Sequence, residues 1–174
     1  GKLGVELSKT TPAARVMVGG LGLGFTLVQV LAGLESDAVV DVAELLPAVV
    51  DWNRSYLQGL NGTALDDSRV QLHVGDAAKL IQKAKPGTYD AVMLDLDNGP
   101  VAMVASSNKN IYSKMGLLGV KRVLKPGGRA IFWSASIDAA FETRLKNAGF
   151  SVEAVPAKVH ARAKRDSYIL YVAE

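Results

Sequence analysis

The sequence predicts an α/β fold, with a mostly parallel sheet, helices on both faces and an antiparallel hairpin at the C-terminal end. Three observations support this prediction. Short apolar runs of strand length alternate with segments of helical spacing along the chain. The first apolar run ends in a cluster of glycines, which is typical of a strand-to-helix turn. The last two apolar runs follow each other without a helical segment between them, as in a hairpin.

Seven segments are predicted to be strands, because they are short apolar runs bounded by glycine, proline or polar residues. The first five are separated by helical segments and therefore run parallel, since a crossover helix returns the chain to the same end of the sheet. The last two form the hairpin. In chain order the strands are expected at residues 16–19, 38–43, 70–74, 89–94, 129–133, 150–155 and 168–172.

Five segments are predicted to be helices from the spacing of their apolar residues. Pro47 is typical of a first helical turn, Asp76 of a residue that caps a helix, and Gly149 of one that ends it. The Lys-Pro-Gly-Gly sequence at 125–128 is typical of a turn. The helices are expected at residues 25–33, 47–56, 77–83, 112–123 and 139–148.

Two predicted connections, residues 57–68 and 95–110, are long for a compact domain. The second follows a buried strand, at the sheet edge where open α/β proteins bind ligands, and a loop of that length is more often functional than not. Trp133 ends the fifth predicted strand near this edge. It is expected to pack in the core, and lining an acceptor pocket is the alternative.

Composition limits the classes of function. The 174 residues, 49% hydrophobic and 21% charged, predict one soluble globular domain over residues 1–174. The net charge of +3 and the absence of an apolar stretch of bilayer length argue against nucleic acid and membrane partners. The chain has no cysteine, and His73 and His160 are not spaced as metal ligands, so no metal is expected.

The basic run at 158–165 is expected to be a solvated hairpin tip, with an anion or RNA contact as the alternative. A signal peptide is not evident, so a cytoplasmic location is expected.

Gly20, Gly22 and Gly24 follow the first predicted strand as Gly-x-Gly-x-Gly. Glycine at such a place adopts positive φ without strain and lets backbone N–H groups approach a nucleotide-like ligand. The dinucleotide fingerprint does not fit, because Phe25 stands where its third glycine would be, and no Gly-Lys-Ser/Thr follows for a P-loop. The spacing favours a nucleoside pocket of the S-adenosylmethionine type, with an unoccupied tight turn as the alternative.

Three acids follow three neighbouring predicted strands. Glu44, 24 residues after Gly20, could accept both hydroxyls of a ribose, or it could be a charge at the start of the next helix. Asp76 could accept an adenine amino group, cap the helix, or do both, while Ala77 leaves space for the ring. Asp95 follows the fourth predicted strand and places a carboxylate at the crevice outside the carboxyl ends of the strands. Since these acids all lie at carboxyl ends of strands, together they indicate an adenosine site.

With these motifs the chain resembles the class I S-adenosylmethionine-dependent transferases, and within them the spermidine synthase (polyamine aminopropyltransferase) family. Val18 stands before the glycine loop, at a position where methyltransferases usually have an acid. The spermidine synthase family likewise lacks an acid there. The other matching motifs are the stretch from Glu44 to Val49, Gly75-Asp76-Ala77, the Tyr-Asp-hydrophobic-Asp pattern within 89–95 and Leu-Lys-Pro-Gly-Gly at 124–128. The resemblance covers roughly residues 14–172. It implies a Rossmann-like class I methyltransferase fold with a seven-stranded sheet.

The resemblance also implies a chemistry. S-adenosylmethionine or its decarboxylated form would be the donor, a small-molecule amine the acceptor, and a homodimer the assembly. No metal is needed, because a sulfonium is already a good leaving group and displacement needs mostly orientation and a proton acceptor. Asp95 would position and deprotonate the amine, with Asp97 as the second acid of that loop. The implied donor-binding residues are Gly20, Gly22, Gly24, Glu44, Leu45, Asp76 and Ala77.

The chain departs from the family pattern at several acids. Leu23 and Leu46 stand where the family has acids, and Asn98 occupies the second acidic position of the loop that begins at Asp95. Residues 1–13 are expected to be a remnant of the family's N-terminal β-rich segment. Two alternatives to aminopropyl transfer therefore stay open: a small-molecule methyltransferase, and a non-catalytic nucleoside-binding or dimerising module.

Overall fold

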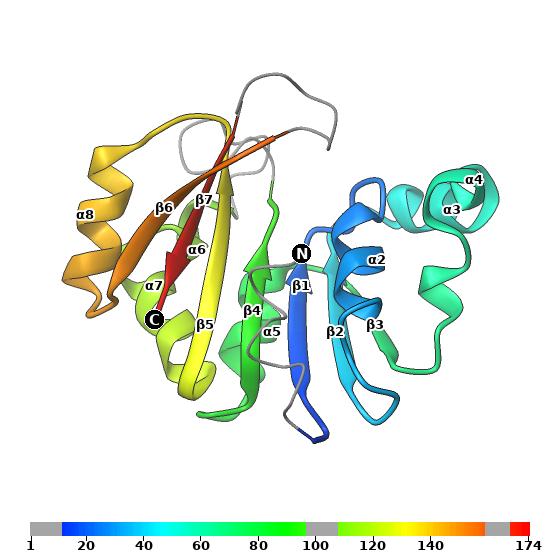
Figure 1. Cartoon of the computed structure of the whole chain (residues 1–174), viewed down its shortest axis with the longest axis horizontal. Coiled ribbons are helices and arrows are strands. Elements are labelled where there is room, and N and C mark those ends of the chain that lie inside the picture. Colours follow the sequence, from blue (N-terminus) through cyan, green and yellow to red (C-terminus); the bar gives the residue numbers. More distant parts are fainter. Residues whose placement is uncertain (1–11, 97–107, 159–167) are drawn as a thin grey trace.

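The computed structural model describes residues 12–96, 108–158 and 168–174, and in these ranges the chain forms one seven-stranded sheet (Figure 1). The strand order is β3-β2-β1-β4-β5-β7-β6. β7 runs antiparallel to both of its neighbours, and the first five strands are parallel. This confirms the predicted fold class. The strands are β1 (Arg15–Gly19), β2 (Val39–Glu44), β3 (Val70–Val74), β4 (Tyr89–Leu94), β5 (Leu124–Ser134), β6 (Val152–Ala157) and β7 (Tyr168–Ala173).

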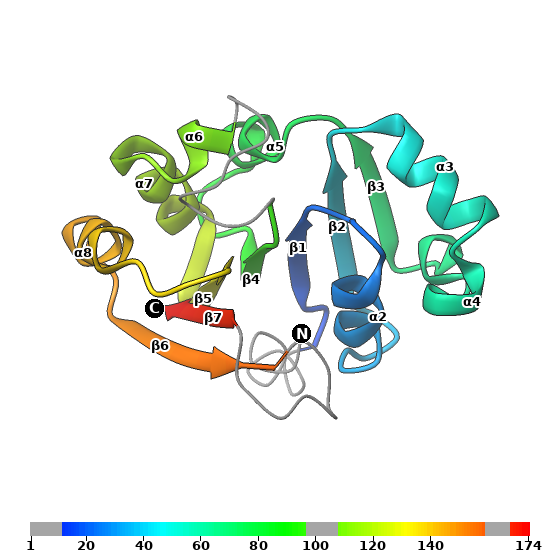
Figure 2. The same cartoon turned by 90° about the horizontal axis from the view of Figure 1, so that it is seen from above.

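Helices cover both faces of the sheet (Figure 2). Successive side chains of a strand point to opposite faces, so the central strand β1 contributes to two cores. Met17 packs in the core beneath α5 (Ala77–Lys83), α7 (Lys114–Val123) and α8 (Ala139–Asn147). Val16 and Val18 pack in the other core, beneath α2 (Phe25–Leu31) and α3 (Pro47–Ser55). Because β1 is buried on both faces, its carboxyl end is held in a fixed position.

The strand order reverses direction between β1 and β4. From β1 the chain builds outward through β2 and β3, and from β4 it builds outward in the other direction through β5. The two connections that leave β1 and β4 therefore diverge above the sheet, and the crevice between them is the usual ligand position in open α/β folds. Gly19 of β1 and Leu94 of β4 are paired at this edge, so the residues that follow them are neighbours.

The Lys-Pro-Gly-Gly segment at 125–128 is part of β5, so its prediction as a turn is wrong. Leu124 pairs with Tyr89, and the register shifts before Arg129 pairs with Ala91. Gly127 has a φ of 77°, a left-handed conformation that glycine adopts freely. These residues therefore produce a bulge within the strand, and do not end the pairing with β4.

Two other segments differ from the sequence prediction. The helix expected at 112–123 is α7 and begins at Lys114, because Ser113 caps it by accepting a hydrogen bond from the backbone N–H of Gly116 at 3.1 Å. The short helix α6 (Asn108–Ile111) precedes it and starts within the connection expected at 95–110. The connection at 57–68 contains the short helix α4 (Gln58–Asn61) and a 3₁₀ turn, Ala64–Asp66. Within the described ranges, none of the helices combines the length and hydropathy that a bilayer crossing requires.

Candidate functional site

The glycine loop lies between the ends of β1 and β4, and its backbone conformation requires the three glycines. Gly20, Gly22 and Gly24 have φ values of 90°, 50° and 83°, in the left-handed region that side chains disfavour. A Cβ at Gly20 would overlap the backbone oxygen of Asp95. The same addition at Gly22 would meet nothing within 4 Å. The loop is therefore closely packed against the end of β4 at Gly20 and open at Gly22.

Two buried asparagines hold the outer half of this loop, and the sequence prediction missed both. Asn53 of α3 donates Nδ2–H to the carbonyl oxygen of Gly22 at 2.9 Å. Asn61 of α4 donates to the Oδ1 of Asn53 and, at 3.4 Å, to the carbonyl oxygen of Leu23. The two residues are only 3% and 7% exposed. Their side chains pack so closely on Gly24 that a Cβ there would lie within 2.9 Å of both.

The carboxylate of Glu44, at the end of β2, joins the glycine loop to the start of α3. Its Oε2 accepts a hydrogen bond from the backbone N–H of Leu21, and its Oε1 accepts one from the N–H of Leu46, both at 2.9 Å. Glu44 is 7% exposed, and the following Leu45 is 42% exposed. Each carboxylate oxygen has a second acceptor direction, so the fixed carboxylate could still accept ribose hydroxyls. That role stays a prediction.

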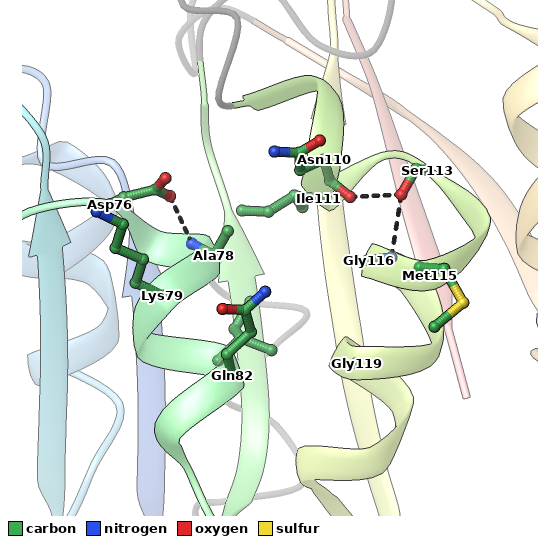
Figure 3. A pocket seen from close by; sticks show the side chains of 11 residues that line it. Asp76, Ala78, Lys79, Gln82, Asn110, Ile111, Ser113, Met115, Gly116 and Gly119 are labelled. Atoms are coloured by element: carbon green, nitrogen blue, oxygen red, sulfur yellow. Dashed lines mark hydrogen bonds between the residues drawn. The ribbon is translucent and has the colours of Figure 1, made fainter.

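Asp76 caps α5, as the sequence predicts, through an Oδ1 that accepts a hydrogen bond from the N–H of Ala78 at 2.7 Å. It also lines a groove of about 480 Å³ between α5 and the segment formed by α6 and α7, where it faces Asn110 (Figure 3). Ala77 is buried in the core below Gly19, with its Cβ 3.4 Å from where a Cβ of Gly19 would lie. Asp76 therefore lies on the wall of this groove, and the small Ala77 side chain lets α5 approach β1. The predicted roles of both residues toward an adenine ring stay predictions.

Asp95 follows β4 directly and is fixed at both its backbone and its side chain. Its N–H donates to the carbonyl oxygen of Gly19 at 2.9 Å, and its Oδ2 accepts a hydrogen bond from the hydroxyl of Thr26 at 3.0 Å. The residue is exposed on one side, but surrounding protein atoms desolvate the carboxylate and raise its pKa above the usual range, while the Thr26 hydroxyl lowers it. A raised pKa makes this carboxylate a better proton acceptor.

Asp95 and Thr26 line a pocket of about 310 Å³ on the α2 side of the sheet. Trp133 contributes to its wall, so the sequence alternative in which this residue lines a pocket is the one the structure supports. Its ring centroid lies 4.6 Å from that of Tyr168, with the ring planes tilted by 41°. The other lining residues are Phe25, Gln29, Met93, Leu94, Ile131, Ala157, Lys158 and Leu170.

The structure thus brings the glycine loop, Glu44, Asp76 and Asp95 to one edge of the sheet, as the sequence predicts. Asp97, the second predicted acid, lies outside the described residues. His73 contacts the Oδ1 of Asp41 at 2.7 Å through its Nε2, on the sheet. Among the residues that the structure describes, no group of three or more His, Asp or Glu side chains could hold a metal ion. The expectation that no metal takes part stays a prediction.

Three residues that contact the candidate site were not revealed by the sequence: Thr26, Asn53 and Asn61. Thr26 lies in the first turn of the helix after the glycine loop, and this position could have indicated that it lies near the carboxyl ends of the strands. Asn53 and Asn61 became relevant only when α3 and α4 were placed against the loop, which no local pattern specifies.

Comparison with known families matches residues 4–146 to the spermine/spermidine synthase domain. Spermine synthase from Arabidopsis thaliana is 33% identical over 121 residues, which are 70% of this chain and 32% of that protein. Putrescine N-methyltransferase 1 from Nicotiana tabacum is 32% identical over 114 residues, which are 66% of this chain and 28% of that protein. The chain therefore spans about a third of the length of these curated relatives.

Among solved structures, human methyltransferase-like protein 13 in complex with SAH is similar, with a TM-score of 0.72 at 21% sequence identity. The match covers 98% of this chain and 75% of that one. The likeness concerns the fold, and it confirms the expected Rossmann-like methyltransferase architecture.

Proposed function

The chain belongs to the spermine/spermidine synthase domain family, and we propose that it transfers an aminopropyl group from decarboxylated S-adenosylmethionine to an amine acceptor. The observation that supports this most directly is the contact between the glycine loop and Asp95. Gly20 leaves no room for a Cβ against the Asp95 backbone, and Asp95 lines the neighbouring pocket. A donor on the loop and an acceptor in that pocket would therefore meet beside one carboxylate.

The residues around the loop fit an adenosyl sulfonium donor. Glu44 is held by two backbone N–H groups, and its remaining acceptor capacity suits ribose hydroxyls. Asp76 uses Oδ1 to cap α5, and Oδ2 can accept from the adenine amino group. Gly22 faces open space, which leaves the loop backbone accessible to the remainder of the donor.

The reaction requires that the donor and the acceptor amine are oriented toward each other and that one group accepts a proton. The charge of Asp95 attracts the acceptor amine in its cationic form. The carboxylate, whose pKa is raised by desolvation, takes one proton from this ammonium and so frees the lone pair of the nitrogen. The neutral nitrogen then attacks the carbon bound to the sulfonium, the carbon–sulfur bond breaks with its electron pair on sulfur, and a neutral thioether leaves. The product is released as a protonated secondary amine, and Asp95 returns its proton to solvent.

Methyl transfer to the amine is the second candidate, and Leu23 is the observation that favours it. The decarboxylated donor ends in a cationic amine, which an acid in the glycine loop would pair with, whereas Leu23 is a 51% exposed apolar side chain. The similar Nicotiana tabacum protein is, by its name, a putrescine N-methyltransferase. Both candidates assign the same acceptor pocket and the same role to Asp95.

Product analysis separates the two candidates. The chain is incubated with a panel of primary amines and diamines and with either donor, and the products are identified by mass spectrometry. An aminopropylated amine formed from the decarboxylated donor supports the proposal. A methylated amine formed from intact S-adenosylmethionine supports the second candidate. Donor binding without any product from either would overturn both and leave a non-catalytic nucleoside-binding module.

The role of Asp95 is tested by Asp95→Asn, which keeps an acceptor for the Thr26 hydroxyl but removes the base. Turnover is expected to fall roughly 10²–10⁴-fold, the usual contribution of a general base, with little change in donor affinity. Asp51→Asn, at an exposed position of α3, removes the same charge elsewhere and should leave turnover unchanged. Full turnover in Asp95→Asn would refute the proposed role.

Homodimer formation and a cytoplasmic location are further proposals, to be tested by light scattering and by cell fractionation.

A further inference from the structure

The groove between α5 and α7 has two polar side chains that point toward each other across it. Asp76 lies on the α5 side, and Asn110 of α6 lies on the opposite side (Figure 3). The small residues Ala78 and Gly116 line the groove next to them. With a volume of about 480 Å³, the groove lies within the range for small-molecule sites, about 300–1,000 Å³.

The backbone of Asn110 is held in place by the start of α7. Its carbonyl oxygen accepts a hydrogen bond from the Ser113 hydroxyl at 2.6 Å, and the oxygen of that hydroxyl accepts one from the N–H of Gly116. A Cβ at Gly116 would overlap the carbonyl oxygen of Asn110, so α6 and α7 can approach this closely only with glycine there. The Asn110 side chain therefore projects from a fixed point on the groove wall.

Asp76 can satisfy only part of an adenine amino group. Its Oδ1 accepts a hydrogen bond from the N–H of Ala78, which leaves Oδ2 for one of the two hydrogens on the adenine nitrogen N6. A second acceptor is needed for the other hydrogen where the groove excludes water. An asparagine amide supplies this acceptor, and its N–H can donate at the same time to the ring nitrogen N7. This bidentate pairing is the one by which asparagine reads adenine.

We propose that Asn110 is a specificity-determining residue that selects adenine together with Asp76. The inference rests on the proposed function, because it places the adenosyl group of the donor in this groove. In the bound complex Oδ2 of Asp76 accepts one N6 hydrogen. Oδ1 of Asn110 accepts the other, and its Nδ2–H donates to N7. Hypoxanthine has an oxygen in place of N6, and this oxygen would face the acceptor atoms of both residues and leave them unpaired.

The binding of neutral thioether nucleosides tests this assignment without any turnover. 5′-Methylthioadenosine, the thioether that aminopropyl transfer leaves behind, is compared by calorimetry with 5′-methylthioinosine and with its own 7-deaza analogue. The wild-type chain is expected to bind the inosine compound about 5- to 100-fold more weakly. The 7-deaza analogue lacks the N7 acceptor and should bind about fivefold more weakly. Equal binding of the adenine compound and either analogue would overturn the inference.

Asn110→Leu assigns the preference for N7 to this side chain. Leucine has a similar size but neither hydrogen-bonding atom, so the preference for 5′-methylthioadenosine over its 7-deaza analogue is expected to disappear. Asn147→Leu makes the same change at an exposed position at the end of α8 and should keep the wild-type preference. A structural defect would weaken both ligands alike and leave their ratio unchanged. An unaltered ratio in Asn110→Leu would therefore contradict the inference.

This inference and the proposed function fail in different ways. If the wild-type chain binds 5′-methylthioadenosine and its 7-deaza analogue equally well, Asn110 does not read N7, and the transferase proposal stands. If the chain binds none of these nucleosides and neither donor, it has no adenosyl site, and both proposals are overturned.

Discussion

Asp95 is the residue at which the donor loop and the acceptor pocket meet. Its backbone N–H is bonded to Gly19 and its carboxylate to Thr26, so the side chain is oriented before any ligand arrives. Surrounding protein atoms raise its pKa, in opposition to the Thr26 hydrogen bond. A carboxylate that is held in place and partly desolvated is suited to take a proton from an amine.

The pH dependence of activity follows from this raised pKa. Asp95 must be ionised to accept a proton, so kcat/KM is expected to increase with pH as Asp95 deprotonates, with a midpoint above that of an exposed carboxyl group. Thr26→Val removes the hydrogen bond that lowers the pKa, and should move this midpoint further up. A pH–rate profile of both proteins measures the effect, and a midpoint that is the same in both would contradict it.

Gly20 and Gly22 offer a matched pair for testing the packing of the loop. Both have positive φ, so alanine at either position costs about 1–2 kcal/mol of unfolding free energy. At Gly20 the new Cβ would also overlap the Asp95 backbone, which should add about 1–3 kcal/mol. Urea denaturation of Gly20→Ala and Gly22→Ala measures the difference, and equal losses would show that the loop is not pressed against β4.

At the scale of elements, α3 and α4 determine the shape of the glycine loop. Asn53 and Asn61 belong to these two helices, and together they bond to the carbonyl oxygens of Gly22 and Leu23. The loop that is expected to hold the donor is therefore positioned by segments that come later in the chain. This arrangement couples donor binding to the docking of α3 and α4.

Asn53→Ala is expected to weaken this coupling. It removes the side-chain donor to the Gly22 carbonyl and one of the two acceptors of the Asn61 amide. This costs about 1–3 kcal/mol of unfolding free energy, and it should also weaken donor binding. Asn147→Ala, at an exposed position near the end of α8, should change stability by less than about 0.5 kcal/mol. Thermal unfolding and donor calorimetry measure both quantities. A variant that loses stability but keeps its donor affinity would limit Asn53 to a structural role.

The end of α2 is fixed by Arg69, whose guanidinium donates to the carbonyl oxygens of Leu31 and Leu34 at 3.0 and 2.8 Å. Asp67 bonds to the same guanidinium, and the contact lowers the pKa of Asp67 from 3.8 to about 2. Because the pKa is lower in the folded state, this contact stabilises the fold above pH 3.8, and the stabilisation is lost as the pH falls through about 2.

Asp67→Asn should remove that pH dependence. The variant is expected to be less stable than the wild-type chain at neutral pH, and the difference should shrink as the pH falls from 3.8 toward 2. Thermal midpoints measured across this range test the expectation. A difference that is constant with pH would show that the ion pair does not stabilise the end of α2.

At the scale of the whole molecule, the sheet and its ligand edge were predictable because the alternation of strands and helices specifies them. Parallel strands joined by crossover helices bring their carboxyl ends to one edge, so Gly20, Glu44, Asp76 and Asp95 had to be neighbours once the strands were recognised. The resemblance to a family then added the donor and the class of reaction.

Other features depended on tertiary contacts that a local pattern does not contain. Asn53 and Asn61 are ordinary polar residues in the sequence, and their burial follows from the docking of α3 and α4. The Lys-Pro-Gly-Gly segment has turn composition, but pairing with β4 keeps it in β5. The pocket wall needs residues from α2, β5 and the hairpin together, so Trp133 could not be assigned to it with certainty from the strand alone.

Calorimetric titration of the chain with the two donors tests the central claim most directly, because it does not depend on the identity of the acceptor. Saturable binding is expected for decarboxylated S-adenosylmethionine and for the intact compound, with the decarboxylated form bound more tightly. Glu44→Gln should weaken both, since an amide oxygen offers less acceptor capacity to the ribose. Binding of neither donor to the wild-type chain would contradict the assignment of the glycine loop, Glu44 and Asp76 to an adenosyl sulfonium site.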